Sequence, residues 1–248
     1  MKQLPENRTM KTIQILPILL FVVAIFVAMP VGASNSGSTR QTRDVKGFHG
    51  ISVSNGVDLY ITQKNVEEVV VEADQDDLDK IITTVEGGIL KIYIKEKSWF
   101  KINWNNAKRK VYVSVKELDK LYASAGADVV SESVLKLNKL DVDASSGSDI
   151  RLELEAGSLS VDSSSGSDIS LKGKVDILQV NASSGGDIDA GNLQSKKCTA
   201  GTSSGSDISI YVTDELNASA SSGGDISFSG NPKIKDINES SGGDVRGR

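Results

Sequence analysis

The most regular chemical feature of this 248-residue chain is a series of aspartates in its second half. Each follows Ser-Ser-Gly-(Ser/Gly) and precedes Ile or Val, at intervals of 18 to 20 residues. The series consists of Asp149, Asp168, Asp187, Asp207, Asp225 and Asp244. A weaker copy, Ser-Ala-Gly-Ala-Asp-Val, adds Asp128, and the sequence Ser54-Asn-Gly-Val-Asp-Leu59 is weaker still. Aspartates beside glycine-rich turns bind Ca²⁺ in nine-residue β-roll repeats, and elsewhere they accept hydrogen bonds within the turn.

Both uses predict that the aspartates form one column on successive turns of a repeat. Unit charges about 5 Å apart repel by roughly 1 kcal/mol in water, so such a column needs compensation. Hydrogen bonds from turn N–H groups or serine hydroxyls would supply it, and so would a row of Ca²⁺ ions. Because the glycine spacing differs from that of the nine-residue repeats, turn chemistry is the favoured interpretation and a calcium ladder is the alternative.

A second candidate site is the aromatic and basic segment formed by residues 97–110. It contains Trp99, Phe100 and Trp104, which include both tryptophans of the chain. Its positive charges are Lys97, Lys101, Lys108, Arg109 and Lys110. Aromatic rings interleaved with basic groups can bind sugar rings or an anionic surface. The three aromatic residues are therefore candidate ligand-binding residues, with capping of the fold as the structural alternative.

The chain has one histidine and one cysteine, which limits its catalytic chemistry. Two-histidine metal sites are excluded, and a Ser-His-Asp site would have to use His49. Cys198 occupies a position where neighbouring repeats have Leu, which predicts a small buried side chain. We assign no catalytic residue, and no cofactor other than Ca²⁺ as an alternative. A polysaccharide-cleaving site built on clustered carboxylates, with Arg151 beside Asp149, is a further alternative.

Alternating apolar and polar residues predict the strands that position the aspartates. Ile150, Leu152 and Leu154 alternate with charged residues, and Leu159 and Val161 alternate with polar ones, as in half-buried strands. When the repeats are aligned, the apolar positions form four columns. These are Leu140, Leu159, Leu178, Cys198 and Leu216; Val142, Val161, Val180, Ala200, Ala218 and Ile237; Ile150, Ile169, Ile188, Ile208, Ile226 and Val245; and Leu152, Leu171, Ala190, Ile210 and Phe228. A single repeat cannot bury its apolar face but a stack can, which predicts an all-β parallel β-helix, or β-solenoid.

The two halves of the predicted solenoid differ in regularity. The C-terminal half has rungs of about 19 residues, and the N-terminal half has longer irregular coils that begin at Val45. Residues 34–44 are polar and lack periodicity, which predicts a flexible leader. Residues 1–33 combine basic residues, an apolar stretch and Val-Gly-Ala, as in a signal peptide. Residues 45–248 are therefore predicted to be one exported solenoid domain.

The composition agrees with a folded and non-nucleic-acid-binding protein. Hydrophobic residues make up 38% of the chain and charged residues 25%, as in ordinary globular domains. The formal net charge is −5, whereas nucleic-acid binding needs clustered positive charge. We therefore expect no nucleic-acid partner.

Several stretches resemble the bacterial family of putative auto-transporter adhesins with a head GIN domain. They begin at Val45-Lys-Gly-Phe-His-Gly-Ile-Ser-Val53 and continue through residues 56–63, 69–74, 81–90 and 111–115 into the Ser-Gly-(Ser/Gly)-Asp-Ile series. The resemblance covers nearly all of residues 45–248. It implies an exported all-β protein with a right-handed parallel β-helix, and it implies no enzymatic activity.

The expected function is a non-enzymatic interaction module of the surface or envelope, of the adhesin kind. The alternatives are a purely structural envelope protein and a polysaccharide-active β-helix enzyme. A glycan or a cell-surface protein is the expected partner, and the final location is the periplasm, the outer-membrane surface or the extracellular space. Unpaired strand edges at the ends of a solenoid also make self-association an expectation.

Overall fold

The described part of the chain is almost entirely β-structure. The computed structural model describes residues 38–95 and 108–248, which belong to one compact unit, Ser36–Arg248. The predicted signal peptide, residues 1–33, lies outside the described residues. So do Trp99, Phe100 and Trp104.

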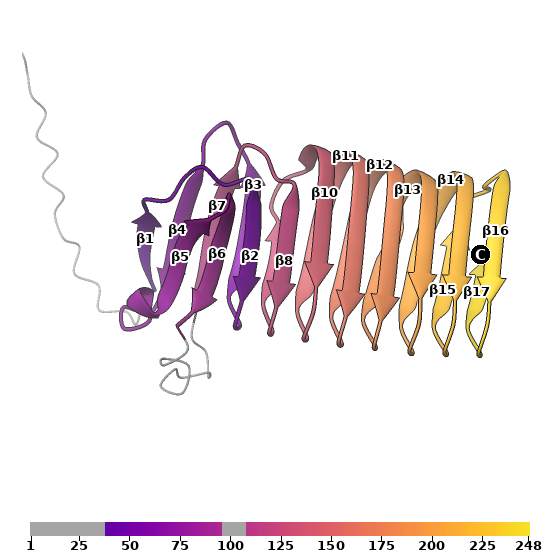
Figure 1. The fold of residues 1–248 in the computed structure, drawn as a ribbon. Coiled ribbons are helices and arrows are strands. Elements are labelled where there is room, and N and C mark those ends of the chain that lie inside the picture. The colour runs from indigo at the N-terminus through magenta and orange to yellow at the C-terminus, as the bar shows by residue number, and fades with distance from the viewer. Residues whose placement is uncertain (1–37, 96–107) are drawn as a thin grey trace, which may run out of the picture. The chain divides into compact units, whose positions relative to one another are not determined.

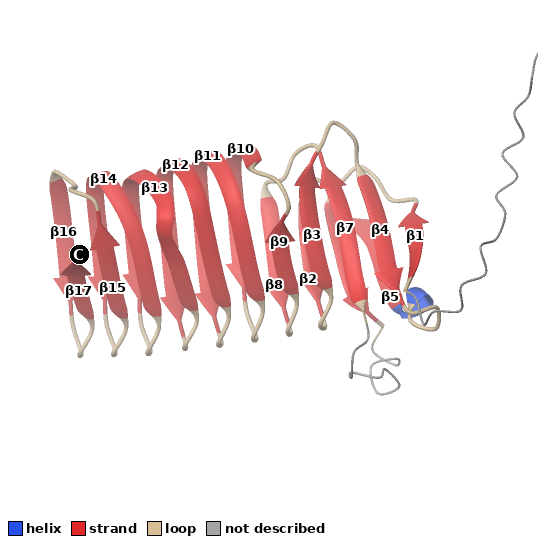
Figure 2. Ribbon diagram, turned by 180° about the vertical axis from the view of Figure 1, so that it is seen from behind, coloured by secondary structure: helices blue, strands red, loops and turns tan. Residues whose placement is uncertain are grey.

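Four long strands build the regular part of the molecule (Figures 1 and 2). They are β11 (Asp149–Ser164), β12 (Asp168–Ser183), β13 (Asp187–Thr202) and β14 (Asp207–Ala220). The start of β11 pairs with β9 (Asp128–Ser131), whereas its later part pairs with β10 (Leu135–Ala144). Each long strand therefore begins on one face of the solenoid, which we call face A, bends, and returns on the opposite face, which we call face B.

The rungs stack in parallel and in register, as the repeat predicts. Asp149 is paired with Asp168, and the Asp168 N–H donates to the carbonyl of Ser148 over 3.1 Å. The four predicted apolar columns are buried between the two faces, apart from Ile237 and Val245 in the last rung. Cys198 is 3% exposed and lies between Leu178 and Leu216, so the prediction of a small buried side chain is confirmed. The β-solenoid is confirmed.

Tight two-residue turns join face B to face A along one edge, which we call the turn edge. In the turn after β11, Ser165 and Gly166 both have left-handed φ angles, 57° and 68°. The same pair of angles recurs in the turn of every motif, down to Asn55 and Gly56 in the weakest one. Two consecutive left-handed residues define a type I′ turn, which favours Gly at its second position. The Ser-Gly dipeptide of the motif is therefore a turn requirement.

The residue before each aspartate is Ser or Gly according to what lies in the preceding rung. Ser167 is fully buried, and its hydroxyl donates to the carbonyl of Ala144 over 2.9 Å. At Gly186 a Cβ atom would lie 2.7 Å from Ser163 Oγ, and at Gly224 it would lie 2.8 Å from Thr202 Oγ1. Where the contacted residue of the preceding rung is Ala, as at Ala144, the residue before the aspartate is Ser. Where the contacted residue is the larger Ser163 or Thr202, the residue before the aspartate is Gly. In the last rung Gly243 lies above Ala220, and the rule does not hold there.

The N-terminal half continues the stack, but not in chain order. β2 (Gly50–Ser54) and β3 (Asp58–Gln63) form a rung next to β8 (Lys120–Ser124) and β9. On their other side they pair in parallel with β6 (Ile89–Ile94) and β7 (Arg109–Val115), which come later in the sequence. The weak motif at residues 54–59 is thus a true member of the series, because Asp58 is paired with Asp128.

Antiparallel strands close the N-terminal end of the stack. On face B, β5 (Ile81–Glu86) pairs with β6, and on face A, β4 (Glu68–Ala73) pairs with β7. The short 3-10 helix η1 (Leu78–Lys80) precedes β5. The irregular N-terminal half is therefore a mixed sheet that includes both parallel rungs and antiparallel edges.

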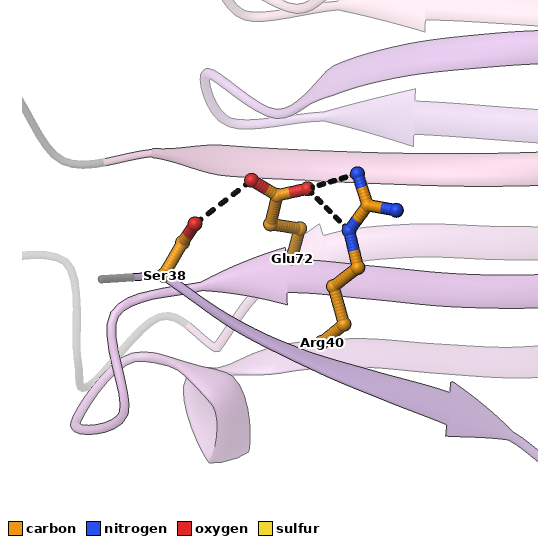
Figure 3. A network of polar contacts seen from close by, with 3 residues as sticks. All are labelled: Ser38, Arg40 and Glu72. Carbon is orange, nitrogen blue, oxygen red and sulfur yellow. Dashed lines mark hydrogen bonds and ion pairs between the residues drawn. The ribbon is translucent and has the colours of Figure 1, made fainter. Parts of the chain in front are cut away.

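The prediction of a flexible leader over residues 34–44 is wrong for Thr39–Arg43, which form β1 and pair antiparallel with β4. Polar contacts hold this strand (Figure 3). Glu72 accepts hydrogen bonds from the Ser38 hydroxyl over 2.8 Å and from Arg40 Nε over 2.7 Å. Because β1 is anchored by backbone pairing and charge, it has no apolar periodicity that the sequence could reveal.

The last described rung closes the other end with charge. It consists of β16 (Ile234–Glu239) and β17 (Asp244–Gly247). Lys235 occupies the column of Leu216, and Glu239 that of Ala220. Lys235 Nζ lies 5.7 Å from the centre of the Phe228 ring, and Glu239 accepts a hydrogen bond from the Val245 N–H. Charged residues in these columns discourage the pairing of the exposed strand edge with another chain. Self-association through the ends of the solenoid stays a prediction.

Candidate interaction surfaces

The aspartates form a continuous column along the turn edge of face A. The column contains Asp58, Asp128, Asp149, Asp168, Asp187, Asp207, Asp225 and Asp244. Lys110, the register partner of Asp58 in β7, ends it with a positive charge. At the other end Asp244 forms an ion pair with Arg246. The predicted column is therefore confirmed, and opposite charges stand at both of its ends.

The charges of the column are only partly compensated. The pKa of Asp168 is raised above its ordinary value mainly by burial, and the negative charges of Asp149 and Asp187 raise it further. Asp187 accepts a hydrogen bond of 2.8 Å from the Asp207 N–H, which is the backbone compensation that the sequence predicts. The buried serine hydroxyls donate to carbonyl groups instead, as Ser148 does to Ala123.

A column differs from a metal-binding cage. Among residues 38–95 and 108–248, no three His, Cys, Asp or Glu side chains converge as they would around a metal ion. Ca²⁺ takes six to eight oxygen ligands, whereas a rung contributes one carboxylate to this column. The calcium ladder is thus an alternative that needs ligands beyond the column itself.

Two tyrosines form a second exposed feature on face A. The rings of Tyr60 and Tyr112, on adjacent strands β3 and β7, stack with centres 5.1 Å apart. The Arg40 guanidinium lies 5.0 Å from the centre of the Tyr112 ring, and Lys110 Nζ lies 5.1 Å from that of Tyr60. Both rings are therefore engaged by each other and by a cation. This cluster stabilises the junction of β1, β3 and β7 and offers little ring surface to a ligand.

The opposite edge of the solenoid, where the long strands bend from face A to face B, carries a groove. We call this edge the corner edge. A groove of about 710 Å³ crosses β10 to β14. Its lining consists of Leu137, Glu155, Ala156, Gly157, Lys174, Val175, Asp176, Gln194, Lys196, Thr213 and Asp214. Five adjacent strands extend over about 19 Å at a spacing of ~4.8 Å.

The walls of this corner groove repeat polar groups at the rung spacing. Glu155 is in register with Lys174, and Lys174 with Gln194. On the other side, Lys196 Nζ lies 2.6 Å from Asp176 Oδ1. Charged and amide groups therefore face solvent in a row.

The corner edge also absorbs the unequal lengths of the rungs. The register shifts between Ser170 and Lys172 where β12 meets β13, and again between Ala190 and Gln194 where β13 meets β14. Gly173 permits a close approach here, since a Cβ atom would lie 2.0 Å from the Leu154 carbonyl oxygen. These irregularities open the groove.

A smaller hollow of about 400 Å³ adjoins the groove through a shared wall residue, Leu137. We call it the basic hollow. It is lined by His49, Gln63, Lys116, Glu117, Leu118, Asp119, Lys136, Leu137, Asn138 and Lys139. His49 Nδ1 lies 2.7 Å from Asp119 Oδ1, and both side chains are about half exposed. The single histidine is thus part of a surface hollow.

Sequence reasoning identified the turn edge and missed the corner edge. The corner groove has no motif, because its residues differ from rung to rung. The only signal is the uneven interval between aspartates, 20 residues before Asp207 and 18 after it, which marks insertions and deletions elsewhere in the rung.

The buried thiol of Cys198, whose pKa burial raises to about 12, has no reactive character.

Neither described range contains a helix long and apolar enough to cross a bilayer.

The fold recurs in solved structures from Bacteroides and Parabacteroides. A structure described as a putative adhesin from Bacteroides fragilis superposes with a TM-score of 0.77 at 22% identity, over 86% of this chain and 98% of that one. One described as a putative lipid binding protein from Parabacteroides distasonis gives 0.67 at 23% identity, over 86% and 98%. A putative adhesin from Parabacteroides merdae gives 0.68 at 18% identity, over 86% and 97%. At these identities the likeness shows the fold.

The search of curated protein sequences gives no match. A family model does match, over residues 47–232, which span β2 to β15 and so include the corner groove and the aspartate column as far as Asp225. The chain therefore belongs to the family described as putative auto-transporter adhesin, head GIN domain.

Proposed function

We propose that this protein is a non-enzymatic interaction module of the bacterial surface or envelope that binds an extended polymer in the corner groove. The observation that carries the proposal is the groove itself, in which polar groups recur on successive rungs of β10 to β14. A ligand with its own short repeat can match such a row. The adhesin description of the family and of two similar structures agrees with a binding role.

The chemistry of the groove favours a glycan over a peptide. An extended peptide rises about 3.3 Å per residue and binds best at a free strand edge. The backbones of β11 and β12 are paired on both sides along most of the corner edge, so they offer few free N–H or carbonyl groups. A linear glycan presents hydroxyls at intervals close to the rung spacing, and Glu155, Lys174 and Gln194 are suited to bind them.

A binding role is favoured over catalysis for two reasons. The aspartates repeat as a structural column, so none is set apart from the others. The only cysteine is buried, and its thiol pKa is raised to about 12.

Binding to immobilised glycans and to isolated surface proteins tests the proposal. We expect saturable binding of a glycan by the purified protein and at least a tenfold loss of affinity in Lys174→Glu, whose side chain lines the groove. Lys172→Glu is the matched control, because this exposed residue lies two positions earlier on the same strand outside the groove. Loss in both variants, or in neither, would contradict the assignment to the groove. A purely structural envelope protein would bind none of the probes.

The location is tested on intact cells of the source organism. We expect externally added protease to degrade the protein without prior lysis. Protection until the outer membrane is opened would assign it to the periplasm and would contradict an adhesin at the cell surface.

A further inference from the structure

We propose that the basic hollow is the subsite for an anionic group of the polymer, so that the ligand is an acidic polysaccharide. This inference rests on the proposed function, since it names the ligand class of the same corner edge. Three lysines and the histidine line the hollow beside two acidic residues, Glu117 and Asp119, although the whole chain has a net charge of −5. Lysines therefore outnumber carboxylates at this end of the groove, and Asp119 is already paired with His49.

The three lysines are engaged only in solvent-exposed ion pairs. The Nζ atoms of Lys116, Lys136 and Lys139 lie 4.0, 3.6 and 3.2 Å from their acidic partners, Glu67, Glu155 and Asp141. Their side chains are 56%, 72% and 63% exposed. By contrast, Lys196 in the groove lies 2.6 Å from Asp176. Exposed pairs of such length contribute little, so the three ammonium groups can turn toward a bound anion at small cost.

The backbone that carries two of these lysines is held in place. Gln63 Nε2 donates to the carbonyls of Lys116 and Lys136 over 3.2 and 3.0 Å, and its Oε1 accepts from the Lys136 N–H over 2.7 Å. One side chain thus ties two separate elements together. The hollow is therefore formed before a ligand arrives, which lowers the entropy cost of binding.

The imidazole that forms one wall is also held. Asp119 binds Nδ1, and the ring lies against Gly88, where a Cβ atom would be 2.4 Å from Nε2. Gly88 sits in the hairpin between β5 and β6, so an N-terminal antiparallel element shapes the hollow. The ring and the lysines surround a space that fits a carboxylate or sulfate.

The neighbouring groove limits where the ligand carries its charge. The groove is lined by three carboxylates, Glu155, Asp176 and Asp214, and by two lysines, Lys174 and Lys196, of which Lys196 is paired with Asp176. Carboxylates outnumber lysines there, which disfavours an anion on every unit of the polymer. The ligand that fits both regions has anionic units separated by neutral, hydroxyl-rich units. The same acidic side chains disfavour an anionic bilayer as the partner, because a flat bilayer would contact the whole corner edge at once and its negative charges would lie against these carboxylates.

Titration of the purified protein with defined glycans tests this inference. Hyaluronate oligosaccharides carry a carboxylate on every second sugar, and chitin oligosaccharides are the neutral comparison. We expect tighter binding of hyaluronate, and at least a tenfold loss for it in the double variant Lys136→Gln/Lys139→Gln with chitin binding unchanged. The control Lys172→Gln/Lys233→Gln removes the same charge from exposed positions outside the hollow.

The outcomes separate the two proposals. If Lys174→Glu abolishes glycan binding while the Lys136 and Lys139 changes leave the preference for hyaluronate intact, the anionic subsite is wrong and the groove stands. If the control double variant loses as much affinity, the effect is one of net charge and the subsite is wrong. Binding to phosphatidylglycerol vesicles without binding to either oligosaccharide would overturn both proposals in favour of a membrane partner.

Discussion

The two long edges of the solenoid differ in almost every respect. Along the turn edge six successive turns repeat the same Ser-Gly pair with left-handed φ angles, and the column aspartate lies two residues after each glycine. Along the corner edge the rungs differ in length and sequence, and the register shifts between β12 and β13 and between β13 and β14. The groove lies on the irregular edge. Sequence repetition thus marks the strict geometry of a turn, whereas variation marks the surface that can be specialised for a ligand.

The physical reason lies in the two kinds of bend. A two-residue type I′ turn requires positive φ at both central positions, which few residues tolerate. The bend at the corner is spread over several residues with ordinary angles, so lengths and side chains can vary there. Gly173 and Gly230 are exceptions with φ of 116° and 93°, each beside a carbonyl oxygen of the neighbouring rung.

The largest effect is expected at one of these corner glycines. In Gly173→Ala the new Cβ would lie 2.0 Å from the Leu154 oxygen, so the rung must shift, and we expect the protein to lose ~3 kcal/mol of stability. Urea and thermal unfolding measure the loss. Gly191→Ala is the control in the same edge, since its nearest neighbour is a flexible side-chain atom at 3.3 Å. Equal losses in both variants would show that the close approach to the Leu154 oxygen does not specifically require glycine at position 173.

A smaller loss is expected at the turn edge. Gly166 has φ of 68° and open space around its Cα, so Gly166→Ala introduces backbone strain without a clash. We expect a loss of about 1 to 2 kcal/mol, measured by the same unfolding curves. Gly166→Asn should cost less, because Asn tolerates the left-handed region. If Ala and Asn are equally harmful, the turn geometry is not the reason for glycine here.

The packing rule at the turn edge predicts a coupled pair. Gly186→Ser places a side chain against Ser163 of the preceding rung and should cost ~1 kcal/mol or more. Ser163→Ala removes the hydroxyl in the way, so the double variant should recover part of the loss. A double-mutant cycle measures the coupling, expected at about 1 kcal/mol. If the two losses of stability simply add, residues 163 and 186 do not interact and the packing rule is wrong at this point.

Neutralising one carboxylate of the column should stabilise the protein slightly. Since burial and like charges raise the pKa of Asp168 in the folded state above its unfolded value, ionisation works against folding. Stability therefore rises as the pH falls through the folded pKa, and the gain is complete below the unfolded value. We expect Asp168→Asn to add ~0.5 kcal/mol at pH 7, a figure reduced for solvent screening, and nothing at pH 3.

Thermal unfolding at both pH values measures this difference, and 0.5 M salt should shrink it at pH 7. The contrasting variant at the corner edge is Asp176→Asn, which removes the ion pair with Lys196 and should destabilise slightly at pH 7. Destabilisation by Asp168→Asn would mean that the column carboxylate makes a favourable contact at neutral pH.

The smallest effect is expected from calcium. If turn chemistry alone explains the column, millimolar Ca²⁺ leaves the melting temperature unchanged. A rise in melting temperature in the parent protein that disappears in Asp168→Asn would instead establish the calcium ladder along Asp149, Asp168 and Asp187. Magnesium at the same concentration is the control for ionic strength.

The regular rungs could be predicted from the sequence, whereas the N-terminal closure could not. Period-two alternation at Ile150, Leu152 and Leu154 reports burial directly, because a strand alternates its sides. Thr39–Arg43 have no such alternation, since the strand is held by its pairing with β4 and by Glu72. The position of the β2–β3 rung between β6–β7 and β8–β9 is likewise a matter of long-range pairing.

Of the candidate surfaces, the aspartate column followed from the motif, and Trp99, Phe100 and Trp104 stay predicted ligand-binding residues outside the described ranges. The basic hollow could not be foreseen. Lys116, Lys136 and His49 are far apart in the chain and carry no shared motif, so only their positions in space bring them together.

The amino-acid sequence by itself determined the stacking of rungs, the buried columns and the acidic turn edge, because each of these repeats and each depends on local geometry. The tertiary structure alone decided which strands close the N-terminal end and where the surface is hollow. Those features arise from contacts between residues distant in sequence. The side chains at such contacts have to fit one another but need no motif or periodicity that could be read along the chain.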